Sequence, residues 1–319
     1  TAHIVDIGGR GFGADANDVF EEGLYIPIMR LMDQGQVNQV LMAIVRGNVR
    51  EPDQLVGDIY ALATCNEIGH RRLAEMMAEF AISDLTQISD FILENSKRAT
   101  IERIAALTNG AASASMKVDG YSSPITLAVK VEIQDAQILA DFDGTSGLDQ
   151  KGINCPLVYT KAYACYALKC AIAPEIPNNA ASLAPFVITA PEDCILNAKH
   201  PAPVALRHIV GHMVPDMVYG ALDQLLPSLV PAEGAGTLCN FQVSLRPRTD
   251  APAPPEARRS EVLTFNSGGS GARPSLDGMN ATAFPSGVMT MPVEATENAG
   301  PVILWRKELR NGSGGTGEY

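Results

Sequence analysis

The first residues with evident chemical potential are His3 and Asp6, which stand just before the glycine-rich loop at residues 8–13. A neutral imidazole is a common metal ligand, and a carboxylate three residues later can bind the same ion or hold the second ring N–H. Glycine lets the backbone come close to a bound ion. From the residues alone two interpretations stay open: a metal ligand with its carboxylate, or a hydrogen-bonded structural histidine.

A second candidate set is His208, His212 and Asp216, which follow one another at intervals of four residues. On one continuous helix the two imidazoles and the carboxylate would share a face, as metal ligands often do. Pro215 removes a helix hydrogen bond and clashes with the preceding turn. We therefore expect the three to straddle a helix start in buried or capping roles, and a metal site is the less favoured alternative.

Carboxylates form the third candidate set. Asp141 and Asp143 end a predicted strand, where the side-chain period of two places them on one face. Like charges held together raise one pKa, as in acid–base sites. The alternative, which we favour, is that Asp143 and Gly144 simply form the turn that ends the strand. Glu22 could supply a general base or be an ordinary exposed carboxylate, and both interpretations stay open.

Two glycine-rich segments, residues 267–271 and 312–317, invite comparison with phosphate-binding loops. Neither ends in the Gly-Lys-Ser/Thr of a P-loop, and neither forms a six-residue dinucleotide fingerprint between a strand and a helix. We predict turns at both, so the sequence does not support a nucleotide site contained wholly in this chain.

The elements that must position these residues follow from periodicity. Apolar residues at helical spacing predict one helix over 53–80 and another from about Asp84, where Gln87 suggests a capping box. Alternating apolar residues predict a hairpin, and shorter apolar runs predict the other elements. These are helices over 159–172 and 215–226, the second opened by proline, and strands over 127–133, 138–142, 186–189, 262–265, 288–291 and 302–305.

Together these elements predict an α+β fold. We expect a core over residues 1–245, with a helical part (15–108) followed by a mixed α/β part with β-hairpins (110–245). Residues 246–260 are rich in proline and form a linker or hairpin tip, because proline lacks a backbone donor and fixes φ. Residues 261–319 are predicted to be β-rich. Both ends are abrupt, so we expect a fragment of a longer chain.

Composition excludes several classes of protein. Of 319 residues, 46% are hydrophobic and 19% are charged, which are ordinary globular values. The net charge of −12 has the wrong sign for a nucleic-acid partner. We find no apolar run long enough for a membrane span and no basic amphipathic helix. The six cysteines contain no Cys-x-x-Cys pair, so a reducing, cytoplasmic location is the default expectation.

A series of short motifs runs along the whole chain. In order they are His3-Ile4-Val5-Asp6-Ile7-Gly8-Gly9, Glu22-Gly23-Leu24-Tyr25-Ile26-Pro27, Asn48-Val49-Arg50-Glu51-Pro52, Gly57-Asp58, Asp141-Phe142-Asp143-Gly144-Thr145-Ser146, Gly152-Ile153-Asn154, Ile176-Pro177-Asn178-Asn179, Pro201-Ala202-Pro203-Val204, Gly269-Ser270-Gly271-Ala272-Arg273, Asp277-Gly278, Pro292-Val293-Glu294 and Ser313-Gly314-Gly315-Thr316-Gly317. No single motif is decisive. In this number and order they resemble the hydantoinase B/oxoprolinase family over essentially the whole chain.

The resemblance implies a subunit of an ATP-dependent enzyme, as in N-methylhydantoinase, 5-oxoprolinase, caprolactamase and the acetone and acetophenone carboxylases. In that family a hydantoinase A-type partner binds ATP and phosphorylates the substrate oxygen, and the B-type subunit carries a divalent metal. The resemblance also implies that His3 is a metal ligand for zinc or manganese, with Asp6 as orienter or additional ligand. The family's Thr-His-x-x-Asp stretch, which supplies further ligands, does not occur in this sequence.

The function expected from the resemblance is hydrolysis of a cyclic amide such as a hydantoin, a lactam or 5-oxoproline. Metal-bound water would attack a carbonyl carbon activated by phosphorylation on oxygen, with Asp6, Glu22, Asp141 and Asp143 as the candidate catalytic carboxylates. One alternative is a subunit of an ATP-dependent ketone carboxylase. The other is a non-catalytic scaffold, suggested because alanines stand at 181 and 184, where the family commonly has a glycine and an arginine.

Overall fold

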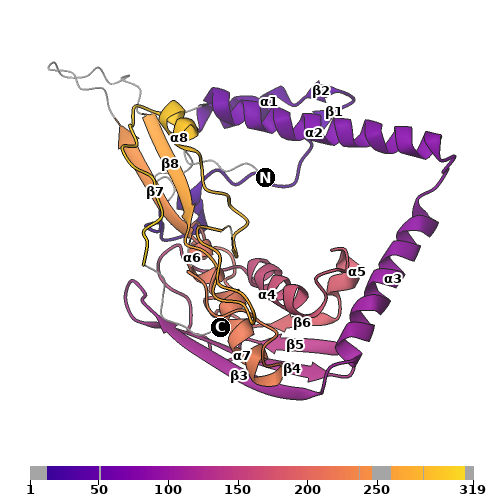
Figure 1. Ribbon diagram of the computed structural model, residues 1–319. Coiled ribbons are helices and arrows are strands. Elements are labelled where there is room, and N and C mark those ends of the chain that lie inside the picture. Colours follow the sequence, from indigo (N-terminus) through magenta and orange to yellow (C-terminus); the bar gives the residue numbers. More distant parts are fainter. Residues whose placement is uncertain (1–12, 50–51, 237, 246–259, 283, 313–319) are drawn as a thin grey trace.

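The computed structural model describes residues 13–49, 52–236, 238–245, 260–282 and 284–312 (Figure 1). A helical N-terminal part leads into a four-stranded sheet with helices on its buried face, followed by a smaller strand pair. This mixture of helices and sheets confirms the predicted α+β class. None of the helices in these ranges has the length and apolar content needed to span a membrane.

The N-terminal part is mostly helical, as predicted. Its elements are η1 (Val19–Glu22), β1 (Met32–Asp33), β2 (Gln36–Val37), α1 (Gln39–Gly47), α2 (Pro52–Glu79) and α3 (Thr86–Ala105). The predicted capping box at Asp84 and Gln87 is wrong, because α3 begins later. The Asp84 carboxylate instead accepts hydrogen bonds from the Thr86 N–H at 3.1 Å and the Thr86 hydroxyl at 2.8 Å. Figure 1 shows α1 and α2 on the side of the molecule away from the sheet.

The main sheet has the strand order β3-β4-β5-β6. Its first two pairings are antiparallel, and β5 and β6 pair in parallel. The predicted hairpin is confirmed as β4 and β5, which turn at Asp135 and Ala136. Alternate residues of β4 are buried, so one face of the sheet forms the core. The bounds are β3 (Gly110–Val118), β4 (Ile125–Gln134), β5 (Gln137–Asp141) and β6 (Phe186–Thr189).

Helices α4 and α7 cover the buried face (Figure 1). Helix α7 packs on β3 and β4, and α4 packs on β6 and on α7. Pro215 lies in the first turn of α7, as predicted, since proline at this position loses no helix hydrogen bond. The bounds are α4 (Leu157–Ile172), α5 (Ala180–Leu183), α6 (His208–Gly211) and α7 (Val214–Leu225). The largest buried side chains include Phe142, Ile104, Leu127, Ile133, Ile138, Leu168, Met217 and Leu222.

The C-terminal part holds β7 (Leu238–Leu245), β8 (Ser260–Ser267) and α8 (Val293–Ala299). The two strands pair antiparallel, with Leu245 opposite Ser260. Residues 246–259, most of the predicted linker or hairpin tip, lie outside the described residues. The predicted strands over 288–291 and 302–305 are wrong, because neither segment pairs with a neighbour. Several of their apolar side chains face solvent instead: Met289, Ile303 and Trp305 are 84%, 77% and 93% exposed.

Candidate functional site

The parallel pairing of β5 and β6 brings two loops to one edge of the sheet. Asp141 at the end of β5 lies opposite Thr189 at the end of β6. The chain leaves both strands at this edge, through residues 142–156 and residues 190–207. Loops at the carboxyl ends of parallel strands are the usual place for ligand sites in α/β sheets. We call these two loops the loop platform.

Backbone hydrogen bonds join the two loops of the platform. The Ile195 N–H donates to the Ser146 carbonyl at 2.9 Å, and the Cys155 N–H donates to the Ile195 carbonyl at 2.7 Å. The Cys155 carbonyl in turn accepts from the Ala198 N–H at 2.9 Å. The platform is therefore held by hydrogen bonds of the strand type, although the two loops are far apart in sequence.

Asn154 ties the platform together from inside. Its side chain is fully buried. The amide nitrogen donates to the carbonyls of Asp149, Lys151 and Pro203 at 2.9, 3.0 and 3.0 Å, and its oxygen accepts from the Asp149 N–H at 2.8 Å. One side chain thus bonds four backbone groups, of which the Lys151 carbonyl also accepts from the Ile153 N–H at 2.7 Å.

The described N-terminal segment docks on this platform. The Gly152 N–H donates to the Ala14 carbonyl at 2.9 Å, and the Val19 N–H donates to the Pro201 carbonyl at 3.0 Å. A Cβ atom at position 152 would lie 3.1 Å from Oε1 of Glu22, so glycine allows this close approach.

Glu22 is the anchor of that segment. Its Oε1 accepts hydrogen bonds from the backbone N–H groups of Val204 and Ala205 at 2.6 and 2.7 Å. Burial raises the pKa of Glu22, and the two backbone bonds and the positive charge of Arg207 partly offset this rise. The half-buried carboxylate therefore has a clear structural task, and its role as a general base stays a prediction.

The carboxylates of Asp141 and Asp143 have different surroundings. Oδ1 of Asp141 accepts a hydrogen bond from the Thr189 hydroxyl at 2.8 Å. Asp143 is exposed in a turn closed by the Thr145 N–H and the Phe142 carbonyl at 3.3 Å. The predicted turn is confirmed, and a catalytic role for either aspartate stays a prediction.

The predicted metal ligand His3 and its neighbour Asp6 lie outside the described residues. Across residues 13–312, apart from the gaps given above, no group of three or more His, Cys, Asp or Glu side chains could hold a metal ion. The described residues therefore do not fit a complete metal centre.

A cavity of about 270 Å³ adjoins the platform at residues 205–207. Helix α4 contributes Tyr159 and Tyr163, which lie one helical turn apart. We call this space the tyrosine–histidine cavity. Its lining residues are Tyr159, Tyr163, Ala205, Arg207, His208, His212, Leu238, Phe265, Ser286 and Val288.

The polar side chains of this cavity contact one another. The Tyr159 hydroxyl lies 3.4 Å from Nε2 of His212, and the rings of His208 and His212 have centroids 5.7 Å apart. Nε2 of His208 lies 3.0 Å from the amide nitrogen of Asn240. Burial, with a smaller contribution from His208, lowers the pKa of His212 to about 4. His212 is therefore a neutral imidazole at pH 7.

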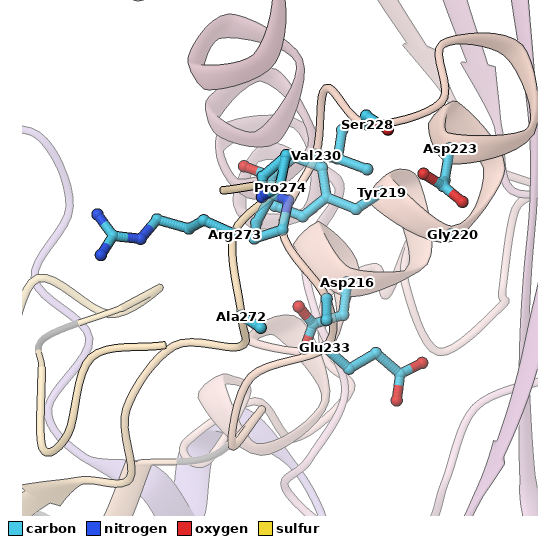
Figure 2. Close-up of a pocket in the computed structure, with 12 residues that line it drawn as sticks. Asp216, Tyr219, Gly220, Asp223, Ser228, Val230, Glu233, Ala272, Arg273 and Pro274 are labelled. Atoms are coloured by element: carbon cyan, nitrogen blue, oxygen red, sulfur yellow. The ribbon is translucent and has the colours of Figure 1, made fainter. Parts of the chain in front are cut away.

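A second cavity, of about 450 Å³, lies between α7 and the segments at 228–233 and 272–274 (Figure 2). It is acidic, because Asp216, Asp223 and Glu233 all line it. Figure 2 shows Arg273 extending away from these carboxylates. The two histidines and Asp216 thus line different cavities, which confirms that the three residues do not form one shared site.

Asp216 is the buried member of the acidic cavity, at 6% exposure. Burial raises the pKa of Asp216 from 3.8 to about 6. A hydrogen bond from the backbone N–H of Gly234 opposes this rise, and the charge of Glu233 adds to it. Oδ1 of this carboxylate has no hydrogen-bond partner. At pH 7 the folded protein therefore keeps a poorly compensated buried charge.

Asp216→Asn is expected to stabilise the protein above pH 7 by on the order of 2–3 kcal/mol. The pKa is raised in the folded state, so the contribution of Asp216 is most favourable below about pH 4 and is lost as the pH rises through about 6. Urea unfolding at pH 4.5 and 7.5 checks this, with Asp223→Asn on the rim as control. Equal gains for Asp216→Asn at both pH values would contradict it.

The sequence analysis did not single out Tyr159, Tyr163 or Arg207. A signal was available, because the tyrosines and His208 with His212 form two pairs at i and i+4. Such pairs lie on one face of a helix. Only the packing of α4 against α6 and α7 shows that the two pairs meet.

The model of the hydantoinase B/oxoprolinase family matches residues 1–319. The chain belongs to this family. Four of the motifs that carry the resemblance meet at one place in the structure: the segments beginning at Glu22, Asp141, Gly152 and Pro201 all lie on the loop platform or dock on it. Segments that are far apart in the sequence thus meet at the candidate site.

Individual relatives and solved structures are similar over nearly the whole of this chain. A protein of Methanocaldococcus jannaschii is 28% identical and matches 100% of this chain and 55% of its own length. The structure of the ATP-dependent caprolactamase from Pseudomonas jessenii is similar over 96% of this chain and 54% of its own, with a TM-score of 0.82 and 21% identity. The structure of acetone carboxylase is similar over 95% of this chain and 43% of its own, with a TM-score of 0.79 and 17% identity. The chain thus spans about half the length of each of these three proteins.

Proposed function

We propose that this chain is the metal-carrying B-type part of an ATP-dependent enzyme that opens a cyclic amide. The substrate is a hydantoin, a lactam or a 5-oxoproline-like ring, whose carbonyl oxygen is first phosphorylated by a hydantoinase A-type partner. The observation that carries this proposal is the family match along the whole chain, together with the meeting of four family motifs at the loop platform. The similarity of the fold to that of the caprolactamase agrees with this proposal.

The proposed metal, zinc or manganese, is assigned to His3, with Asp6 as its orienter or a further ligand. Both residues lie outside the described ones, and the described part of the chain offers no three-ligand cluster. This chain spans about half the length of the Methanocaldococcus jannaschii protein and of the caprolactamase structure. We therefore propose that the remaining metal ligands belong to the part of the full-length protein that lies outside this chain. Nitrogen and oxygen ligands suit zinc and manganese alike.

A partner subunit is supported by exposed apolar side chains. Tyr60 on α2, Phe80 just after α2 and Phe91 on α3 are 42%, 65% and 69% exposed, and Tyr25 after η1 is 71% exposed. Apolar and aromatic anchors of this kind are typical of interfaces. Phe12, a further aromatic residue near the glycine-rich loop at residues 8–13, lies outside the described residues. We propose a heterodimeric or heterotetrameric assembly in which the partner binds ATP, and a cytoplasmic location stays a prediction.

The test uses the full-length protein with its hydantoinase A-type partner, ATP and one of three rings: a hydantoin, caprolactam or 5-oxoproline. We expect ring-opened product and ADP only when both chains are present. Ring opening by the B-type chain alone, or without ATP, would overturn the proposal.

Two further outcomes would select the alternatives. ATP turnover that depends on bicarbonate and a methyl ketone, with none on the rings, would show a ketone carboxylase, whose fold this chain also resembles. A full-length preparation that binds no metal and supports no turnover after metal is added would show a scaffold.

A further inference from the structure

The acidic cavity and the tyrosine–histidine cavity differ in charge. The acidic cavity is lined by three carboxylates, and Arg273 points away from them (Figure 2). Among the described residues, those that line the tyrosine–histidine cavity include Arg207 and no Asp or Glu. Like charges repel strongly in a partly buried site. An anionic ligand is therefore favoured in the tyrosine–histidine cavity and disfavoured in the acidic cavity.

Two contacts hold the side chain of Arg207 at the wall of the tyrosine–histidine cavity. Its Nη1 donates to the Val204 carbonyl at 3.2 Å, and its guanidinium carbon lies 5.4 Å from the centre of the Tyr159 ring. Arg207 is half-buried, and the bond to Val204 uses one of its five N–H groups. A planar guanidinium of this kind matches the paired oxygens of carboxylate and phosphate.

Tyr159 adds a neutral donor beside this cation. Burial raises the pKa of Tyr159, so its hydroxyl keeps its proton at pH 7. Nε2 of the neutral His212 lies 3.4 Å from this hydroxyl, and Tyr163 packs against the ring of Tyr159 with centroids 4.9 Å apart. A Cβ at Gly211 would lie 2.3 Å from the Tyr159 ring, so glycine allows the ring to take this place.

The cavity is continuous with the platform. Ala205 lines it, and the N–H of the same residue is bound by the Glu22 carboxylate at 2.7 Å. The segment that positions Arg207 is therefore the segment that anchors the N-terminal part of the described chain. A ligand in the cavity would lie beside the place where the family motifs meet.

We propose that the tyrosine–histidine cavity binds an oxyanion, with Arg207 as its cationic partner and the Tyr159 hydroxyl as a second donor. This inference rests on the proposed function, which supplies such a group twice: the phosphoryl group on the activated substrate oxygen, and the carboxylate of the ring-opened product. The site thus selects the charged end of the reacting molecule.

The test measures binding of inorganic phosphate and of acetate to the full-length complex by isothermal titration calorimetry. We expect Arg207→Gln to weaken binding about 10- to 100-fold and Tyr159→Phe to weaken it about 3- to 10-fold. Tyr159→Phe keeps the ring packing, so it tests the site even if Arg207→Gln does not fold. Arg273→Gln, at the acidic cavity, is the control and should bind like the unaltered protein.

The outcomes separate the two possible sources of the oxyanion. Binding of phosphate alone identifies the phosphoryl group as the ligand, and binding of acetate alone identifies the carboxylate. Absence of binding of both, or equal binding by the Arg207→Gln, Tyr159→Phe and unaltered proteins, would overturn the inference. The complex could open no ring and yet bind the anion, with binding lost in the Arg207→Gln and Tyr159→Phe variants. That result would overturn the proposed function and support the oxyanion site.

Discussion

Replacing Asn154 by alanine is expected to lower the free energy of unfolding by about 3–4 kcal/mol. The fully buried amide satisfies four backbone groups, on Asp149, Lys151 and Pro203. Alanine removes the side-chain partner of all four groups, and only the Lys151 carbonyl keeps another bond, from the Ile153 N–H at 2.7 Å. Each group left without a partner where water has little access costs about 1–3 kcal/mol without strict additivity. The loss falls on the junction between the two loops of the platform.

Urea unfolding at pH 7 measures this change. Asn95→Ala is a matched control, because the Asn95 side chain also bonds a backbone carbonyl, that of Phe91 at 2.7 Å, but on an exposed face of α3. We expect the control to lose less than about 1 kcal/mol. Unfolding of Asn154→Ala at the same urea concentration as the control would show that the platform does not depend on this side chain.

His3→Ala is expected to weaken metal binding greatly and to abolish turnover in the full-length complex while leaving the fold nearly unchanged. It removes one of about three protein ligands, and the other ligands cannot hold the ion as tightly. Asp6→Asn should be milder, at about 10- to 100-fold in affinity or activity, if Asp6 orients the histidine.

Metal content by mass spectrometry and an anomalous-scattering map of the intact complex check this expectation, with circular dichroism to follow the fold. His70→Ala, at an exposed position on α2, is the control. A metal more than about 4 Å from the His3 ring, where ligand distances near 2 Å are required, would show that His3 is structural. Full activity of His3→Ala would show the same.

The local elements of the core were predictable from the sequence because periodicity reports which face of an element is buried. The helix over 53–80 and the β4–β5 hairpin are confirmed with small changes at their ends. The same rule failed at 288–291 and 302–305. A strand needs a hydrogen-bonded neighbour, and the sequence of the strand does not show whether one is present.

Family membership also followed from the sequence, because ordered motifs survive along the chain whatever their place in space. The sequence did not predict that several of these motifs meet in space. Oε1 of Glu22 binds the N–H of Val204, 182 residues away, and no local pattern predicts a contact across that distance.

The tertiary structure alone decided which residues share a site. Spacing put His208, His212 and Asp216 into one candidate set, but the break between α6 and α7 sends the histidines and the aspartate to different cavities. It also brought Tyr159, near the start of α4, next to Arg207, in the loop that follows β6. Sequence spacing determines contacts within one helix or strand, whereas packing between elements determines the charge and shape of a cavity.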